Sequence, residues 1–147
     1  MDLHSGLGPW GGYRLILEHD WETPGLHWFG RHFGESLVEP SEPKRGISYR
    51  RRGGRGPWWA GLLAPGAYEL LIAEFGTYPL PMVLLALREE NRDWLRGQES
   101  LRRRWVKAAL REAFAPASPR WRARVLHRGL ELLHRAVEVC RLEGVPT

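Results

Sequence analysis

The chain has 147 residues, 43% of them hydrophobic and 27% charged, as in a globular domain with a single core. No run of about 18 apolar residues occurs and the first residues carry no secretory signal, which excludes a spanning helix and predicts a cytoplasmic protein without a membrane partner. Cys140 is the only cysteine, so an intrachain disulfide and a cysteine-based zinc site are both excluded. The net charge of +5 permits contact with nucleic acid but does not establish it, because the arginines are spread along the chain.

The first third of the chain predicts short elements separated by glycine and proline. Residues 2–12 are expected to be the end of a strand that runs into a glycine-rich loop. Residues 13–20 have the apolar and β-branched character of a short strand. A short helix is expected over 26–38, and an extended surface loop over 39–57.

Residues 68–77 form the clearest predicted strand, a continuous apolar run of the kind that is buried on both faces. A single acid, Glu74, interrupts the run near its end. Beyond it, apolar residues recur at three- and four-residue spacing, which is typical of helices. The predicted helices cover residues 79–97, 99–115 and 121–143.

This order of elements predicts an α/β fold, or an α+β fold, in which helices pack on a sheet. Two clear strands are fewer than a stable sheet needs. We therefore expect residues 1–147 to be a single partial domain whose N-terminal strands are missing from this chain.

Glu74 is the first candidate for chemistry. A carboxylate at the end of a buried strand is costly unless it is paired, solvated or used. Ligand sites of α/β sheets gather beyond the carboxyl ends of strands, where Glu74 would lie. A carboxylate in this position could act as a general base on water. The structural alternative is that Glu74 is a solvent-facing acid on an edge strand or a helix cap.

His4 holds the corresponding place at the start of the chain. In an extended segment Asp2 and His4 project to the same face, so Asp2 would accept a hydrogen bond from the imidazole and fix its tautomer for metal binding. The alternative is a mobile side chain near a terminus.

The remaining candidates are weaker. His27 and His32 are five residues apart and do not share a helix face well, and His127 and His134 lack an intervening carboxylate at ligand spacing. Cys140 lies among apolar residues, which predicts a buried, inert thiol. The chain has no Gly-x-Ser-x-Gly, Walker or dinucleotide motif, so acyl-enzyme and nucleotide chemistry are disfavoured, and no cofactor-binding residues are assigned.

Two segments carry a family resemblance: DLHSGLGPWG at residues 2–11 and EFGTYP at residues 74–79. They resemble the C-terminal signatures of an uncharacterised bacterial branch, the domain of unknown function DUF2817, of the zinc carboxypeptidase superfamily. Ser5 replaces the threonine of that branch's Asp-Leu-His-Thr-Gly-Leu-Gly motif. The helical end of the chain is similar as well, so the resemblance covers nearly the whole sequence.

The resemblance implies the C-terminal part of a zinc-carboxypeptidase-like fold, a mixed sheet flanked by helices. It implies that His4 is the distant zinc ligand and Glu74 the general base of a hydrolase that cleaves a peptide or amide bond. The family's His-x-x-Glu zinc motif precedes the distant histidine, and no such motif precedes His4 here; His32 and Glu35 fit the letters but follow it, and we interpret them as chance. The chain alone is therefore expected to bind zinc weakly or not at all and to be inactive, with a separate N-terminal half as its possible partner.

Two other classes of function stay open. An arginine-glycine run at residues 50–56, with Trp58 and Trp59 for stacking, would suit a nucleic-acid-binding module, although one short run makes nucleic acid an unfavoured partner. The second class is an inactive interaction scaffold, which would pair its exposed strand edges with a partner chain.

Overall fold

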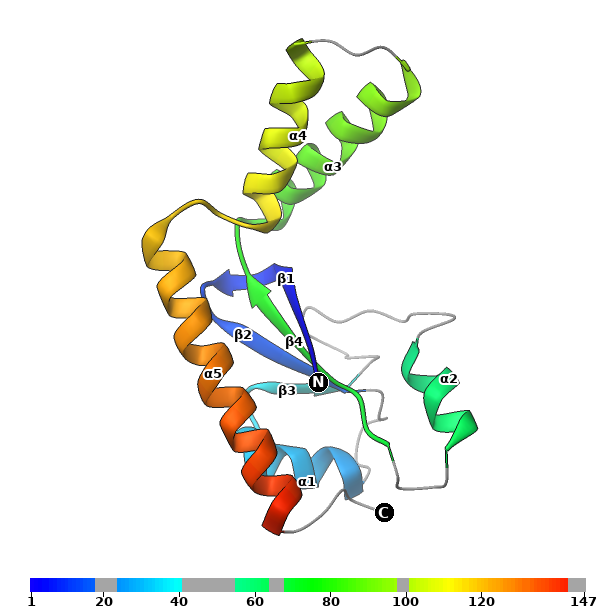
Figure 1. Cartoon of the computed structure of the whole chain (residues 1–147), viewed down its shortest axis with the longest axis vertical. Coiled ribbons are helices and arrows are strands. Elements are labelled where there is room, and N and C mark those ends of the chain that lie inside the picture. Colours follow the sequence, from blue (N-terminus) through cyan, green and yellow to red (C-terminus); the bar gives the residue numbers. More distant parts are fainter. Residues whose placement is uncertain (18–23, 41–54, 64–67, 98–100, 143–147) are drawn as a thin grey trace. The chain divides into compact units, whose positions relative to one another are not determined.

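A computed structural model describes the chain in five stretches, residues 1–17, 24–40, 55–63, 68–97 and 101–142 (Figure 1). The fold is α/β, as predicted, with a four-stranded mixed sheet and helices. The chain forms two compact units. The first unit comprises residues 1–4, 14–73 and 127–147, and the second comprises residues 5–13 and 74–126.

The sheet has the strand order β1-β4-β2-β3. Its strands are β1 (Asp2–Trp10), β2 (Tyr13–Leu17), β3 (Val38–Pro40) and β4 (Leu71–Gly76). The neighbours β2 and β3 are parallel, with Leu15 opposite Val38. Strands β1 and β4 each begin in the first unit and end in the second.

The first unit has an apolar core built from strands and one helix face. Strand β2 buries its last three residues, and β4 buries its first three, which explains why both read as apolar runs. Helix α1 (Pro24–Phe33) adds aromatic side chains, and the later part of helix α5 (Pro119–Leu142) adds aliphatic ones. The buried apolar residues of this unit are Leu15, Ile16, Leu17, Phe29, Phe33, Leu71, Ile72, Ala73, Leu132 and Val139.

Helix α1 ends five residues earlier than the 26–38 prediction. Its last residue is Phe33, and Gly34 follows with a φ of 104°, a conformation that favours glycine. The Gly34 N–H donates to the Gly30 carbonyl at 2.8 Å, as at the end of many helices. The chain then enters β3, so part of the expected surface loop over 39–57 is strand, and its end belongs to helix α2 (Arg55–Leu62). Residues 41–54 of that loop lie outside the described residues.

The glycine-rich loop predicted within residues 2–12 is wrong, because β1 continues to Trp10. Gly6 and Gly8 lie inside the strand with φ values of 154° and 115°. Glycine density indicates a break in regular structure, whereas here the absence of a side chain at Gly6 leaves room for the Glu74 carboxylate and the Phe114 ring. The turn comes only at Gly11, whose φ is 61°.

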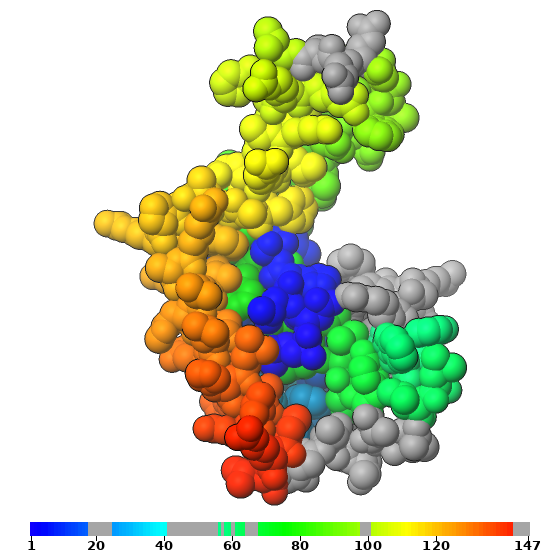
Figure 2. All heavy atoms as spheres, viewed as in Figure 1, coloured from blue at the N-terminus to red at the C-terminus, as the bar shows by residue number. Residues whose placement is uncertain are grey.

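The second unit carries the helices α3 (Leu80–Leu95) and α4 (Leu101–Phe114) and the start of α5. Helices α3 and α4 pack side by side as a hairpin, the green and yellow pair in Figure 1. Figure 2 shows their atoms in contact along the hairpin. All three predicted C-terminal helices are confirmed to within about two residues at each end. Among the described residues, no helix is both long and apolar enough to cross a membrane.

Candidate functional site

Residues 5–11 of the first signature segment lie against the second signature segment in the second unit. The Thr77 hydroxyl donates to the Gly6 carbonyl at 2.8 Å, and the Leu7 N–H donates to Glu74 Oε1 at 3.1 Å. The Gly11 N–H donates to the Gly76 carbonyl at 2.9 Å. Residues 74–77 and residues 5–12 therefore form one structural element, which we call the paired signature.

Gly76 is the position at which the paired signature tolerates no side chain. A Cβ built there would lie 2.2 Å from the Pro9 carbonyl oxygen and 2.4 Å from Gly8 backbone atoms. These neighbours are backbone atoms of an adjacent segment and cannot rotate away. Glycine in the EFGTYP segment thus permits the close approach of the DLHSGLGPWG segment.

Side chains from the later helices attach to the same element. The Trp121 indole N–H donates to the buried Gly76 carbonyl at 2.9 Å. The Ser5 hydroxyl donates at 2.6 Å to the carbonyl of Phe114, which ends α4 and has no partner within its own helix. The Trp121 contact adds a second donor to a carbonyl that the Gly11 N–H already bonds, and the Ser5 contact satisfies a carbonyl at the end of a helix.

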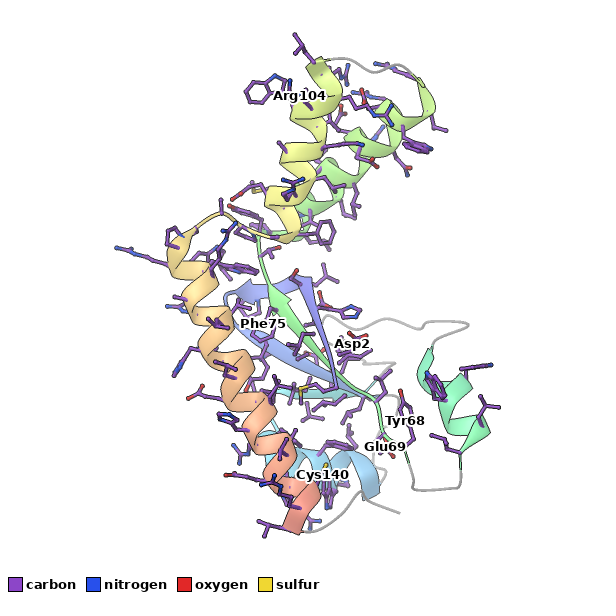
Figure 3. The ribbon with its side chains drawn as sticks, viewed as in Figure 1. Asp2, Tyr68, Glu69, Phe75, Arg104 and Cys140 are labelled. Atoms are coloured by element: carbon purple, nitrogen blue, oxygen red, sulfur yellow. The ribbon has the colours of Figure 1, made fainter. Side chains whose placement is uncertain are left out.

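Glu74 is half-buried at the centre of the paired signature. Side chains alternate along a strand, so Glu74 lies on the face opposite Phe75, which is 1% exposed and packs on the Tyr13 ring with centroids 5.4 Å apart (Figure 3). Glu74 Oε1 comes within 3.3 Å of the position that a Cβ on Gly6 would take. The glycine thus leaves room for the carboxylate beside β1.

His4 and Asp2 belong to the first unit. His4 Nε2 lies 3.0 Å from Asp2 Oδ2, and the side chains are 45% and 28% exposed. The prediction that the two side chains share a face of the strand is confirmed. Their roles as metal ligand and supporting acceptor stay predictions.

The described residues do not complete a zinc site by themselves. They contain no group of three or more His, Cys, Asp or Glu side chains that could hold a metal ion, whereas a catalytic zinc has three protein ligands. His32 lies in α1, with its ring centroid 4.4 Å from that of Trp28 and the two rings tilted by 50°, while Glu35 follows the break at Gly34. His127 Nε2 lies 3.4 Å from Glu131 Oε1 on an exposed face of α5, so the expectation that His127 and His134 lack an intervening carboxylate at ligand spacing is wrong.

Sequence reasoning missed a polar pair at the start of α3. The Tyr78 hydroxyl donates to Glu112 Oε1 at 2.6 Å, and the Ala117 N–H donates to the other carboxylate oxygen at 2.9 Å. The hydrogen bond with Glu112 raises the pKa of Tyr78, with burial adding to it. The same bond and the Ala117 N–H lower the pKa of Glu112. Thirty-four residues separate the partners, so no local spacing signals this contact.

The structure also bears on the predictions for Cys140 and for the nucleic-acid alternative. Cys140 is exposed, so the expected buried thiol is wrong; the side chain borders a cavity of about 110 Å³ in the first unit, with Trp28 and Phe29 also in its lining (Figure 3). Of the arginines of the nucleic-acid alternative, Arg50–Arg52 lie outside the described residues, and Arg55 begins helix α2. The two tryptophans of that alternative, Trp58 and Trp59, are exposed, with ring centroids 4.8 Å apart.

Comparison with known proteins gives one match. The family described as "Protein of unknown function (DUF2817)" matches residues 1–128, which include the whole paired signature and its Trp121 contact. No curated protein and no solved structure matches the chain. The chain therefore belongs to the DUF2817 family.

Proposed function

We propose that this chain contributes one metal-ligand histidine, His4, and one general base, Glu74, to a zinc-dependent hydrolase that cleaves a peptide or amide bond. The proposal places the family within the carboxypeptidase-like zinc hydrolases, on the resemblance of its two signature segments. The observation that carries it is the contact of 3.0 Å between His4 Nε2 and Asp2 Oδ2. Histidines that bind metals commonly donate their second ring N–H to a carboxylate.

The proton on Nε2 determines which His4 nitrogen would bind the metal. With Nε2–H donated to Asp2, the proposal assigns Nδ1 as the nitrogen that binds the metal. Asp2 would hold the ring orientation and raise the basicity of the imidazole. Asp2 is thus a positioning residue in this proposal.

Glu74 would act on the water. Its carboxylate accepts the proton from the attacking water and returns it to the leaving amine. The Leu7 N–H holds one oxygen, so the carboxylate is oriented by backbone rather than by a flexible partner. The second oxygen is the one that the proposal assigns to the proton transfer.

The other metal ligands and the groups that bind the substrate are proposed to come from a separate polypeptide segment that carries His-x-x-Glu. The described residues include His4 but no group of three side chains that could bind a metal ion together. We therefore expect weak zinc binding and no amide hydrolysis from the 147-residue chain by itself. Tight one-to-one zinc binding with hydrolysis by this chain alone would contradict that expectation.

The test combines the chain with a polypeptide carrying the His-x-x-Glu segment and measures zinc-dependent amide hydrolysis. Glu74→Gln is expected to lower kcat by about 100-fold or more while leaving zinc binding intact. His4→Ala is expected to weaken zinc binding itself. Glu69→Gln, a carboxylate just before β4, is the matched control and should change neither. Hydrolysis that survives Glu74→Gln would exclude the general-base assignment.

A further inference from the structure

Helix α2, in the first unit, carries four large apolar side chains that the chain leaves exposed. Trp58, Trp59, Leu62 and Leu63 are 60%, 43%, 61% and 42% exposed. Their spacing of i, i+1, i+4 and i+5 places all four on one face of the helix. The Leu63 N–H donates to the Trp59 carbonyl at 3.1 Å, so the helical geometry continues to the end of this face. We call these four residues the α2 face.

The α2 face is a continuous apolar surface without charges of its own. No charged residue occurs from Gly56 to Tyr68. A Cβ built on Gly61 would meet nothing within 4 Å, so α2 lies open at that position as well. Single exposed apolar residues are common on protein surfaces, whereas adjacent ones of this size mark a surface that contacts something else.

The sequence before the α2 face is strongly basic. Residues 43–55 contain six basic side chains and no acid; the six are Lys44, Arg45, Arg50, Arg51, Arg52 and Arg55. Only Arg55, the first residue of α2, lies among the described residues. The charge of this basic run follows from the sequence, and its last member is three residues from Trp58. A partner that covers the α2 face therefore lies beside a run of positive charge, which favours an anionic partner.

The combination of residue types favours a lipid surface. Tryptophan is enriched at the boundary between lipid headgroups and acyl chains, because its ring is apolar and its N–H is polar. Leucine side chains reach further into the acyl chains. Basic clusters of about four to eight Lys or Arg beside an apolar helix face attract anionic headgroups.

Single-stranded nucleic acid, the other polyanion, matches the α2 face less well. Successive bases stack on open aromatic ring faces. The Trp58 and Trp59 rings instead meet edge to face, with centroids 4.8 Å apart and planes at 72°. Leu62 and Leu63 have no ring to stack on a base and would stay exposed to water.

We propose that the α2 face inserts into the headgroup region of a membrane that contains anionic lipid, with the basic run beside it attracting the headgroups. The contact is peripheral. The expectation of no membrane partner follows from the lack of a long apolar run, which a peripheral contact does not need. The proposal does not depend on the proposed hydrolase, because no residue of α2 takes part in that chemistry.

Flotation of the full 147-residue chain with lipid vesicles measures the contact. The chain should float with vesicles of mixed phosphatidylglycerol and phosphatidylcholine. It should bind pure phosphatidylcholine vesicles about tenfold more weakly or not at all, because they lack the negative surface potential. Raising the salt concentration from about 0.1 M to about 1 M should weaken binding to the anionic vesicles, because it screens the charges.

A pair of double variants tests whether α2 makes the contact. Trp58→Ser combined with Leu62→Ser removes the two most exposed side chains of the α2 face and should lower vesicle affinity about tenfold or more. Leu101→Ser combined with Trp105→Ser is the matched control. It removes the same two residue types, also four residues apart and 74% and 76% exposed, from α4 and should have little effect. Unchanged helical circular dichroism would show that both variants are folded.

Several results would overturn the proposal. The absence of flotation with anionic vesicles would exclude a membrane contact, and equal binding to both vesicle compositions would exclude the role of charge. An equal loss in the two double variants would show that the α2 face is not the contact. Saturable binding of a fluorescein-labelled oligothymidylate that exceeds vesicle binding and is lost in the α2 variant would assign the face to nucleic acid. Light scattering that shows a dimer abolished by the α2 variant, without vesicle binding, would assign it to a second copy.

Discussion

The paired signature and the α3–α4 hairpin belong to the same compact unit but differ in how far their large side chains are buried. In the paired signature, Thr77 and Trp121 are 2% and 6% exposed and each donates a hydrogen bond to the backbone of the signature. In the hairpin, Leu84 and Leu85 are each more than 50% exposed. The signature is thus tightly packed, whereas the hairpin presents apolar surface that the described residues do not cover. Substitutions should therefore cost much stability in the signature and little in the hairpin.

The largest expected effect is at Gly76. Gly76→Ala forces a Cβ to within 2.2 Å of the Pro9 carbonyl oxygen, so the two segments must separate. We expect a loss of about 3 kcal/mol or more in the free energy of unfolding, above the usual range for an added methyl group because the obstacle is backbone. Urea denaturation followed by circular dichroism measures it.

The matched control is Gly61→Ala in α2, where a Cβ would meet nothing within 4 Å. Alanine is a better helix former than glycine, so this variant should be unchanged or up to about 1 kcal/mol more stable. Equal stability of the two alanine variants would show that the signature segments do not pack as described.

A smaller effect is expected from removing one buried hydrogen bond. Trp121→Phe keeps an aromatic ring but removes one of the two donors to the buried Gly76 carbonyl, which keeps the Gly11 N–H, so it should cost about 0.5–1.5 kcal/mol. The same change in the hairpin, Trp105→Phe, alters a side chain that is 76% exposed and should cost about 0.5 kcal/mol or less. Thermal unfolding of both variants compares the two regions directly, and a larger cost at Trp105 would reverse the comparison.

The smallest expected effect on stability concerns Tyr78 and Glu112, which line a cavity between α3 and α4. The lowered pKa of Glu112 gives stability that is present above the ordinary glutamate pKa and lost as pH falls through its folded value. The raised pKa of Tyr78 gives stability that is present below its ordinary value of 10.0 and lost as pH rises through its folded value. The stability difference between the protein and Tyr78→Phe should therefore be widest between about pH 5 and pH 9. A flat profile for Tyr78→Phe would contradict the pairing.

The sequence predicted elements better than it predicted contacts. The strand around Glu74 and the three C-terminal helices follow from apolar periodicity, which reports burial of one face. The continuation of β1 through Gly6 and Gly8 did not follow, because glycine signals a loop and a close backbone approach equally well. Only the partner segment at Gly76 distinguishes the two, and it lies far away in the sequence.

In the candidate site, too, the local features were predictable and the contacts between distant segments were not. The shared face of Asp2 and His4 was predictable, because alternation along a strand is a local rule. The pairing of Tyr78 with Glu112 and the exposure of Cys140 were not, because both depend on which helix faces are covered. Periodicity marks an apolar face in α3 and α5 alike but does not say whether a neighbour within the chain buries it.

The most direct test of the proposed function is a Co²⁺ titration of the isotopically labelled chain followed by NMR, with Co²⁺ in place of zinc. We expect the ring signals of His4 to shift or broaden first among the six histidines and His4→Ala to abolish the change. Weak binding that is confined to His4 would agree with an incomplete ligand set. If His127, His134 or the α1 histidines respond first while His4 is unaffected, the metal-ligand assignment of His4 is wrong.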